Sequence, residues 1–393
     1  MTTLLVDLAF AAVAIGIAWL AARLLVWQFG APAPMGRFLP LDGLRGLLAV
    51  SVMVHHSAIW YGYIKTGQWV LPVSPVFAEL GQGSVLMFFM ITSFLFTGKI
   101  LNAHGDVDWR HLLVSRIFRL TPLYWFAMLC MLLLVGVSSH WQLRESLPQL
   151  WNHLSTWLAY TISGYPDINH VADTWRLVAG VTWTLVYEWM FYLALPLLAL
   201  LMGRKPGWLP VVVSLLALWW LLDRWHPNLR MIVVFVLGGL TAGVVVKKSW
   251  LNQFATSVPA HWLVLLTILT VLLVFHTAYD IWPTLMLWMV FTMIASGNTL
   301  FGLLVNPATR QLGDQAYSIY LLHGMALYVV FHVLLGEMQV REWTFVTYWT
   351  TLLSVVPVVV GVSFVTWRGI ERNGMLLGQR LSVKIVSKMH LSH

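Results

Sequence analysis

Long apolar stretches separated by short polar connections dominate the pattern of this chain. Most are about 20 residues long, the length a helix needs to cross a bilayer, and none shows the two-residue alternation of a transmembrane strand. The pattern therefore predicts an all-α polytopic membrane protein with eleven helical spans. The predicted spans are residues 5–27, 43–63, 77–98, 121–137, 181–202, 208–222, 230–246, 261–279, 282–300, 315–335 and 345–367.

Three boundaries carry further information. The first span lacks a basic leader and a small-residue cleavage site, so we expect a retained helix and not a signal peptide. Thr121 followed by Pro122 is typical of an N-cap with proline at the first helical position, which predicts that span four begins there. Residues 139–180 form the longest polar connection, and a loop of this length is usually functional or partly structured.

Composition supports the membrane class. Of the 393 residues 59% are hydrophobic and 10% charged, and the mean hydropathy is +0.78, whereas a soluble domain carries about 25% charged residues. The single cysteine, Cys130, excludes a disulfide within the chain and a multi-cysteine metal site. The net charge of +8 comes from basic residues scattered between spans, so no nucleic-acid surface is predicted.

Lys and Arg predict the orientation of the spans. If the N-terminus lies outside, 17 of the 23 basic residues fall on the cytoplasmic side and 6 on the outer side. The positive-inside rule favours this arrangement, with a cytoplasmic C-terminus. Arg45, Arg116 and Arg119 are then expected at the cytoplasmic side, and the 139–180 segment faces outward.

Arg45 and His56 are the most informative polar pair within an apolar run. Eleven residues are nearly a whole number of helical turns, so both lie on one face, about 16 Å apart along the axis, while His55 points about 100° away from His56. An ionisable side chain within a span indicates function by default. His56 could be a general base or a hydrogen-bonded core histidine, and zinc is a weaker option because no metal-ligand spacing stands nearby.

Four other residues have both a functional and a structural interpretation. Arg116 and Arg119 are adjacent on a helical face and could bind a polyanion or anchor lipid phosphates. Glu188 is the one acidic residue deep in an apolar run, and it could bind an acceptor hydroxyl or pair with an Arg or His of another span. His323, in span ten, could be catalytic or a satisfied core histidine.

Six ordered motifs resemble the acyltransferase-3 family, integral-membrane enzymes that O-acylate surface glycans. The motifs are Leu41-Asp-Gly-Leu-Arg45 followed by His56, Phe88-Phe89 with Thr92-Ser93-Phe94, Arg116-Ile-Phe-Arg119 with Pro122-Leu-Tyr-Trp125, Trp183-Thr-Leu with Glu188 and Phe191-Tyr192, Tyr317-Ser-Ile-Tyr-Leu-Leu-His323, and Glu371-Arg372. The family pattern has serine and glycine where this chain has Thr92 and Ser93, and proline where it has Asn373. These departures concern packing and leave the proposed chemistry intact.

The resemblance implies catalytic, donor-binding and acceptor-binding roles for these residues. His56, Glu188 and His323 would be catalytic; Arg45, Arg116 and Arg119 would bind a cytoplasmic acyl-CoA, most simply acetyl-CoA, as donor substrate. Trp183, Tyr192, Tyr317 and Tyr320 would contact the glycan or lipid-linked sugar acceptor. No permanently bound cofactor and no metal are expected; the remaining partners are membrane lipids, and the location is the bacterial inner membrane.

The domain division follows from the same resemblance. Residues 1–36 are expected to form an extra transmembrane helix and linker, 37–373 the acyltransferase-like membrane domain, and 374–393 a basic cytoplasmic tail.

Two other classes of function stay open at this point. A proton-coupled transporter would also need intramembrane His and Glu, although no inverted repeat is visible, and a catalytically silent lipid or glycan scaffold would bind no CoA.

Overall fold

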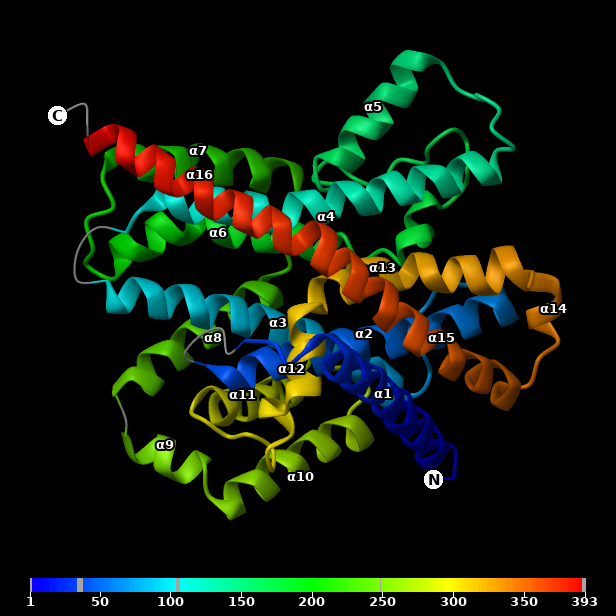
Figure 1. Cartoon of the computed structure of the whole chain (residues 1–393), viewed down its shortest axis with the longest axis horizontal. Helices are drawn as coiled ribbons and strands as arrows, with labels where there is room; N and C mark the ends of the chain where they lie inside the picture. The colour runs from blue at the N-terminus through cyan, green and yellow to red at the C-terminus, as the bar shows by residue number, and fades with distance from the viewer. Residues whose placement is uncertain (1, 34–37, 104–106, 248, 391–393) are drawn as a thin grey trace. The chain divides into compact units, whose positions relative to one another are not determined.

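The structure is a computed structural model and describes residues 2–33, 38–103, 107–247 and 249–390. Over these ranges the regular structure is helical, and no β-strand forms in the part of the chain described (Figure 1). Seven of the helices are long and apolar enough to cross a membrane. The protein is therefore an all-α polytopic membrane protein, as predicted. Arg37, Lys248 and residues 391–393, which entered the charge count or the predicted tail, lie outside the described residues.

The helical elements occur in the following order. They are α1 (Thr2–Phe29), α2 (Leu39–Thr66), α3 (Pro75–Asn102), α4 (Trp109–Ser138), α5 (Leu147–Leu158), η1 (Thr174–Val178), α6 (Trp183–Leu201), α7 (Trp208–Arg224), α8 (Leu229–Lys247), α9 (Ser249–Ala255), α10 (Val258–Val274), α11 (Ile281–Ala295), η2 (Leu303–Val305), α12 (Pro307–Asp314), α13 (Ala316–Tyr328), η3 (Val329–Leu334), α14 (Glu337–Arg341), α15 (Phe345–Thr366), η4 (Trp367–Glu371) and α16 (Arg372–His390).

Each of the eleven predicted spans overlaps a helix, but the predicted spans 261–279 and 282–300 extend five residues beyond the ends of α10 and α11. The seven of spanning length include α1 to α4, α6, α13 with its continuation η3, and α15 with its continuation to Leu381. The helices α8, α10 and α11 are shorter apolar helices, and α7 has 17 residues. The expected cytoplasmic tail begins inside α16, so its described residues are helical.

The predicted start of span four is wrong. α4 begins at Trp109, where the Asp108 side chain accepts a hydrogen bond from the His111 N–H at 2.9 Å, and Pro122 lies inside the helix. Proline removes one N–H, which would have paired with the carbonyl of Phe118 four residues earlier. A Cβ on Gly374 would lie 2.6 Å from that carbonyl oxygen. The backbone of α16 therefore packs directly over the interrupted turn.

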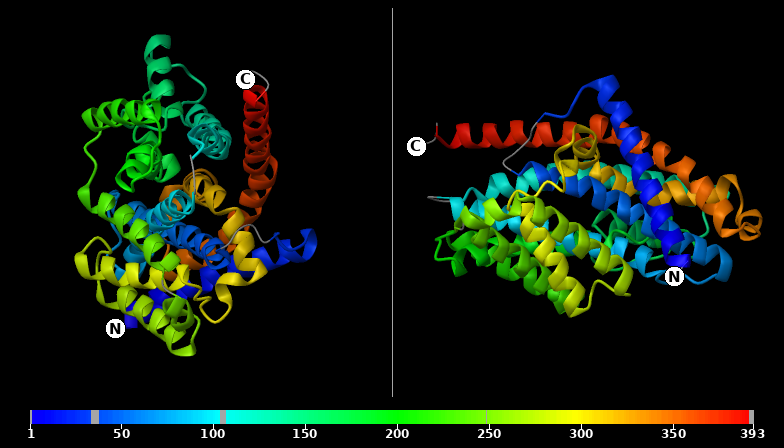
Figure 2. Two further views of the ribbon diagram at one scale, coloured as in Figure 1. Left: turned by 90° about the vertical axis from the view of Figure 1, so that its left-hand side faces the viewer. Right: turned by 90° about the horizontal axis from the view of Figure 1, so that it is seen from below.

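The chain divides into two compact units, each built from two separate stretches of sequence. The first combines residues 1–98 with 228–363, and the second combines 99–227 with 364–393. In the first, α2 packs along α12 and α13 and also contacts α1. In the second, α16 packs along α4, and α6 lies beside α7 (Figures 1 and 2).

Glycines allow the closest approach within the first unit. A Cβ on Gly43 would lie 1.9 Å from the Leu304 carbonyl oxygen, and one on Gly46 would lie 2.5 Å from the Gly313 nitrogen. In return, a Cβ on Gly313 would lie 1.9 Å from the Asp42 carbonyl oxygen. The two glycines flanking Arg45 therefore fix α2 against the η2–α12 segment backbone to backbone, where any side chain would force the helices apart.

Candidate functional site

His56 and His323 meet in the first unit. The Nε2 atom of His323 on α13 lies 3.0 Å from the Nδ1 atom of His56 on α2, and the ring centroids are 5.0 Å apart. Gly46 packs on Gly313 ten residues before His56, and His323 follows Gly313 by ten residues as well. The two segments therefore run in the same direction between these contacts, although α12 and α13 are separate helices that meet at Gln315.

The surrounding carbonyls assign the tautomers of the two rings. His323 Nδ1 lies 3.0 Å from the Ile319 carbonyl oxygen, so it carries the hydrogen and leaves a lone pair on Nε2. His56 Nδ1 faces two acceptors, the Val52 carbonyl oxygen at 3.0 Å and that His323 lone pair. It therefore carries the hydrogen as well, and the lone pair of His56 is on Nε2. A neutral imidazole with its tautomer fixed in this way can accept a proton at Nε2.

His55, the neighbouring histidine, is bound to the backbone. Its Nδ1 lies 2.7 Å from the Phe77 carbonyl oxygen, to which it donates, and its side chain is buried. A Cβ on Gly81 would lie 2.2 Å from the His55 ring, so α3 closes tightly over it. This contact makes His55 a link between α2 and α3.

Arg45 and the two tyrosines of the late motif belong to the same unit. Arg45 is partly buried on α2 between the tightly packed Gly43 and Gly46, about 16 Å along the axis from His56. Tyr317 and Tyr320 are buried on α13. The Tyr320 ring lies 6.3 Å from His323 and 6.1 Å from Phe88, between centroids.

Glu188 lies in a second polar cluster, within the second unit. The Tyr192 hydroxyl, one turn along α6, donates a hydrogen bond to the Glu188 carboxylate. Arg116 of α4 is hydrogen-bonded to Tyr192 and electrostatically coupled to Glu188, with Arg119 close enough to influence Arg116 and Tyr192. A carboxylate and a guanidinium that share a buried tyrosine compensate each other's charge.

An apolar cavity adjoins this cluster in the second unit. Its volume is about 200 Å³, and it is lined by Tyr160, Trp189, Trp220 and four aliphatic side chains of α6, α7 and the turn after α5. Tyr160 shares a hydrogen bond of 2.7 Å with Thr121, and burial raises the pKa of its hydroxyl to about 12. Trp183, at the start of α6, makes an edge contact with Tyr187, 5.7 Å between centroids, and does not line this cavity.

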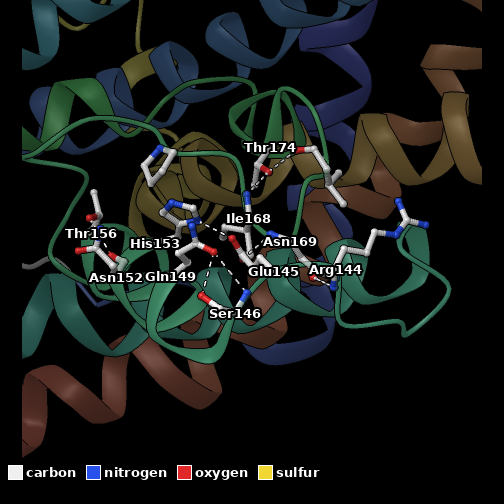
Figure 3. Close-up of polar contacts among 12 residues, drawn as sticks. Arg144, Glu145, Ser146, Gln149, Asn152, His153, Thr156, Ile168, Asn169 and Thr174 are labelled. Carbon is white, nitrogen blue, oxygen red and sulfur yellow. Dashed lines mark hydrogen bonds and ion pairs between the residues drawn. The ribbon is translucent and has the colours of Figure 1, made fainter.

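The 139–180 connection has an ordered polar core that the sequence patterns did not reveal (Figure 3). The buried Glu145 carboxylate lies 2.9 Å from His153 Nδ1 on α5 and accepts the Asn169 N–H at 2.7 Å. The Asn169 amide donates to the Gln142 carbonyl and accepts the Arg144 N–H, both at 2.7 Å. These contacts tie both ends of the connection to α5, so the predicted partial structure is present.

Sequence reasoning identified the individual polar residues and gave an Arg or His of another span as one possible partner of Glu188, but it did not identify which residues meet. His56 with His323, and Arg116 with Glu188 and Tyr192, are each contacts across helices distant in sequence. Each histidine follows its contacting glycine by ten residues, but this spacing could be used only after the structure had shown that Gly46 and Gly313 meet.

Comparisons with known proteins agree with this architecture. A family model described as "Acyltransferase domain" matches residues 39–368, which is most of the chain. Nodulation protein 10 of Rhizobium leguminosarum bv. viciae is 25% identical over 382 residues, covering 87% of this chain and 96% of that protein. No solved structure matches the chain significantly. From its helices and its family match, the chain belongs to the acyltransferase-3 family and is a membrane acyltransferase.

Proposed function

We propose that this protein transfers an acetyl group from cytoplasmic acetyl-CoA to a hydroxyl of a surface or lipid-linked glycan. The observation that carries the proposal is the contact between His56 Nδ1 and His323 Nε2, which assigns the basic lone pair of His56 to Nε2. O-Acyl transfer needs such a base, because a sugar hydroxyl is a weak nucleophile until its proton is accepted.

The proposed reaction runs through the His56 ring. Nε2 accepts the proton of the acceptor hydroxyl while the hydroxyl oxygen attacks the thioester carbonyl carbon. The carbon–sulfur bond then breaks, and the leaving thiolate accepts this proton from Nε2. The products are an ester and free CoA. His323 accepts the hydrogen bond from Nδ1 throughout, which favours the imidazolium that forms during transfer.

The residues proposed to bind the acceptor are assigned from the chemistry of their side chains and from the residues that they contact. We propose that Glu188 orients the acceptor hydroxyl, and that Trp183, Tyr192, Tyr317 and Tyr320 contact the sugar. The apolar cavity beside Trp189 and Trp220 has room for part of a hydrocarbon chain, which favours a lipid-linked acceptor.

The donor assignments rest on the guanidinium groups. Arg45, Arg116 and Arg119 are proposed to contact the phosphates of CoA, since arginine binds phosphate oxygens in a bidentate manner. A pantetheine arm has roughly the 15–20 Å reach of a five- to six-residue extended chain. This reach matches the axial distance of about 16 Å between Arg45 and His56.

We further propose that the protein lies in the bacterial inner membrane with its N-terminus outside and its C-terminus in the cytoplasm. A Cys130→Ser background allows single cysteines to be introduced near either end. An impermeant thiol reagent applied to intact cells should label the N-terminal site and not the C-terminal one. The reverse labelling would refute this orientation.

The function is tested with purified protein in lipid nanodiscs and acetyl-CoA labelled in the acetyl group. CoA release together with label in a glycan acceptor is the expected result, and no solute flux should accompany it in proteoliposomes. Solute flux without acetyl transfer would support a transporter, and absence of CoA binding would support a scaffold.

A further inference from the structure

The helix α5, near the start of the 139–180 connection, buries only one edge of its apolar face. Its leucine and tryptophan side chains fall within an arc of about 120° when successive residues are placed about 100° apart. Trp157, at one edge of this arc, is the one buried residue of α5, a helix that the structure describes throughout. At the other edge, Leu147 and Trp151 are each 68% exposed. An amphipathic helix whose apolar face is partly uncovered indicates a further contact surface.

Contacts with the rest of the second unit fix the rotation of α5 about its axis. The Tyr124 hydroxyl donates to the Trp157 carbonyl at 2.6 Å, and the Trp157 indole N–H donates to the Pro166 carbonyl at 2.9 Å. Next to this buried edge, the His153 ring lies 2.9 Å from the Glu145 carboxylate (Figure 3). The exposure of the opposite edge is therefore set by the fold, because α5 cannot turn that edge inward without breaking these contacts.

The uncovered edge of α5 continues an apolar row on the helix that precedes it. α4 is long and apolar enough to cross a membrane, and the face opposite its buried one exposes about half of Leu129, Leu133 and Val137. Trp141 follows at the same four-residue interval and is 70% exposed, while its N–H donates to the Gly136 carbonyl at 2.8 Å. Exposed apolar side chains thus follow the chain from the lipid-facing side of α4 into α5.

The chemistry of this edge matches the surface of a bilayer. Tryptophan is enriched where lipid meets water, because its indole has an apolar body and one polar N–H. No lysine, arginine, aspartate or glutamate occurs in α5, and its polar face carries amide, hydroxyl and imidazole groups. α5 also meets α4 near its own C-terminal end and diverges from it (Figures 1 and 2). This geometry suits a helix that leaves a spanning helix to lie on the membrane.

We infer that α5 is an interfacial helix whose Leu147–Trp151 edge inserts, together with Trp141, between the lipid headgroups and the acyl chains. The partner is the bilayer that α4 crosses. The first part of the 139–180 connection is then attached to the membrane surface and does not extend freely into water. This inference does not depend on the proposed acyl transfer.

Spin labels on the full-length protein in nanodiscs test the inference. In the Cys130→Ser background, Leu147→Cys carries a label on the uncovered edge, and Asn152→Cys carries one on the polar face about 140° away. Oxygen concentrates in the bilayer, whereas a nickel chelate stays in water. The ratio of oxygen to nickel collisions should be several-fold higher for the label at position 147 than for the one at position 152.

Trp151→Glu tests the same edge without moving the label. With the label at position 147, the ratio should fall to the value of the polar-face label, because a carboxylate on this edge resists burial among acyl chains. Gln149→Glu is the matched control, since it adds the same charge to the polar face and glutamate can keep the capping contact with Ser146. It should leave the ratio unchanged. Anionic lipid in the nanodisc should also leave it unchanged, because α5 has no cationic face.

Three results would overturn the inference. A label at position 147 that collides mainly with the nickel chelate would place the edge in water. A label shielded from both reagents would mean that protein, such as a second copy of the chain, covers the edge. A ratio that stays high in Trp151→Glu would show that Trp151 does not hold α5 on the bilayer. The comparison of the two labels decides between lipid, water and protein even if a glutamate variant fails to fold.

Discussion

The two units each bury a polar cluster between helices, and the clusters differ in how their polarity is balanced. In the first unit, His56 and His323 are joined by one hydrogen bond. It places the His56 hydrogen on Nδ1 and leaves the lone pair on Nε2. In the second unit, Glu188 and Arg116 are opposite charges that share Tyr192. The first arrangement is suited to moving a proton, and the second to holding two charges in place at low dielectric.

This difference teaches that burial of an ionisable group does not by itself indicate chemistry. Glu188 and His56 looked equally anomalous in the sequence, since both interrupt apolar spans. Their partners separate them, because the Glu188 carboxylate is held by the Tyr192 hydroxyl near Arg116, while the His56 imidazole is hydrogen-bonded at Nδ1 and keeps its Nε2 lone pair. The following substitutions challenge that distinction, from the largest expected effect to the smallest.

His56→Ala should reduce acetyl transfer about 10³-fold, because it removes the proposed general base. The measurement is single-turnover CoA release from acetyl-CoA in nanodiscs. His55→Asn is the control, since His55 donates to the Phe77 carbonyl and should affect stability far more than rate. Equal loss of activity in both variants would indicate a packing defect and contradict the assignment.

Glu188→Ala should lower the free energy of unfolding by about 3 kcal/mol, because it strands the Arg116 guanidinium in a buried site. A double variant, Glu188→Gln with Arg116→Met, should regain most of that stability, as measured by SDS-induced unfolding. We expect it to remain poorly active, since the acceptor would lack its orienting carboxylate. Recovery of activity with stability would show that Glu188 serves the fold alone.

His323→Ala should lower kcat about 10- to 100-fold with little change in KM, because His56 loses the hydrogen bond that fixes its tautomer. His323→Gln can present a side-chain oxygen to His56 Nδ1 and should recover part of the rate. Steady-state kinetics on both variants test this. A Gln variant as inactive as the Ala variant would argue against an acceptor role for His323.

Gly46→Ala should cost about 1–3 kcal/mol, because its Cβ would lie 2.5 Å from the Gly313 nitrogen and force the two helices apart. Gly62→Ala is the matched control on the same helix, where a Cβ meets nothing within 4 Å, and it should be neutral or slightly stabilising. Thermal unfolding of the two variants distinguishes close packing from general helix propensity. Equal melting temperatures would contradict the packing.

The sequence predicted what depends on local pattern. The eleven apolar segments and the common face of Arg45 and His56 follow from length and helical period. The start of α4 was mispredicted because proline usually occupies the first turn of a helix. The close contact of Gly374 with the Phe118 carbonyl, which lacks its helical N–H, comes from about 250 residues away in the chain.

Contacts between distant helices required the structure. No local sequence pattern indicates that His323 hydrogen-bonds to His56. Nor does one indicate that the glycines beside Arg45 contact the backbone of the η2–α12 segment.

The most direct test of the central claim is the ring-nitrogen NMR spectrum of His56 in protein labelled with ¹⁵N-histidine in nanodiscs, assigned by difference from His56→Ala. The account predicts a protonated, pyrrole-like Nδ1 and an unprotonated, pyridine-like Nε2 in wild type, and mixed tautomers in His323→Ala. A pyridine-like Nδ1 in wild type, with its proton on Nε2, would contradict the claim that His323 prepares His56 to accept a proton from the acceptor.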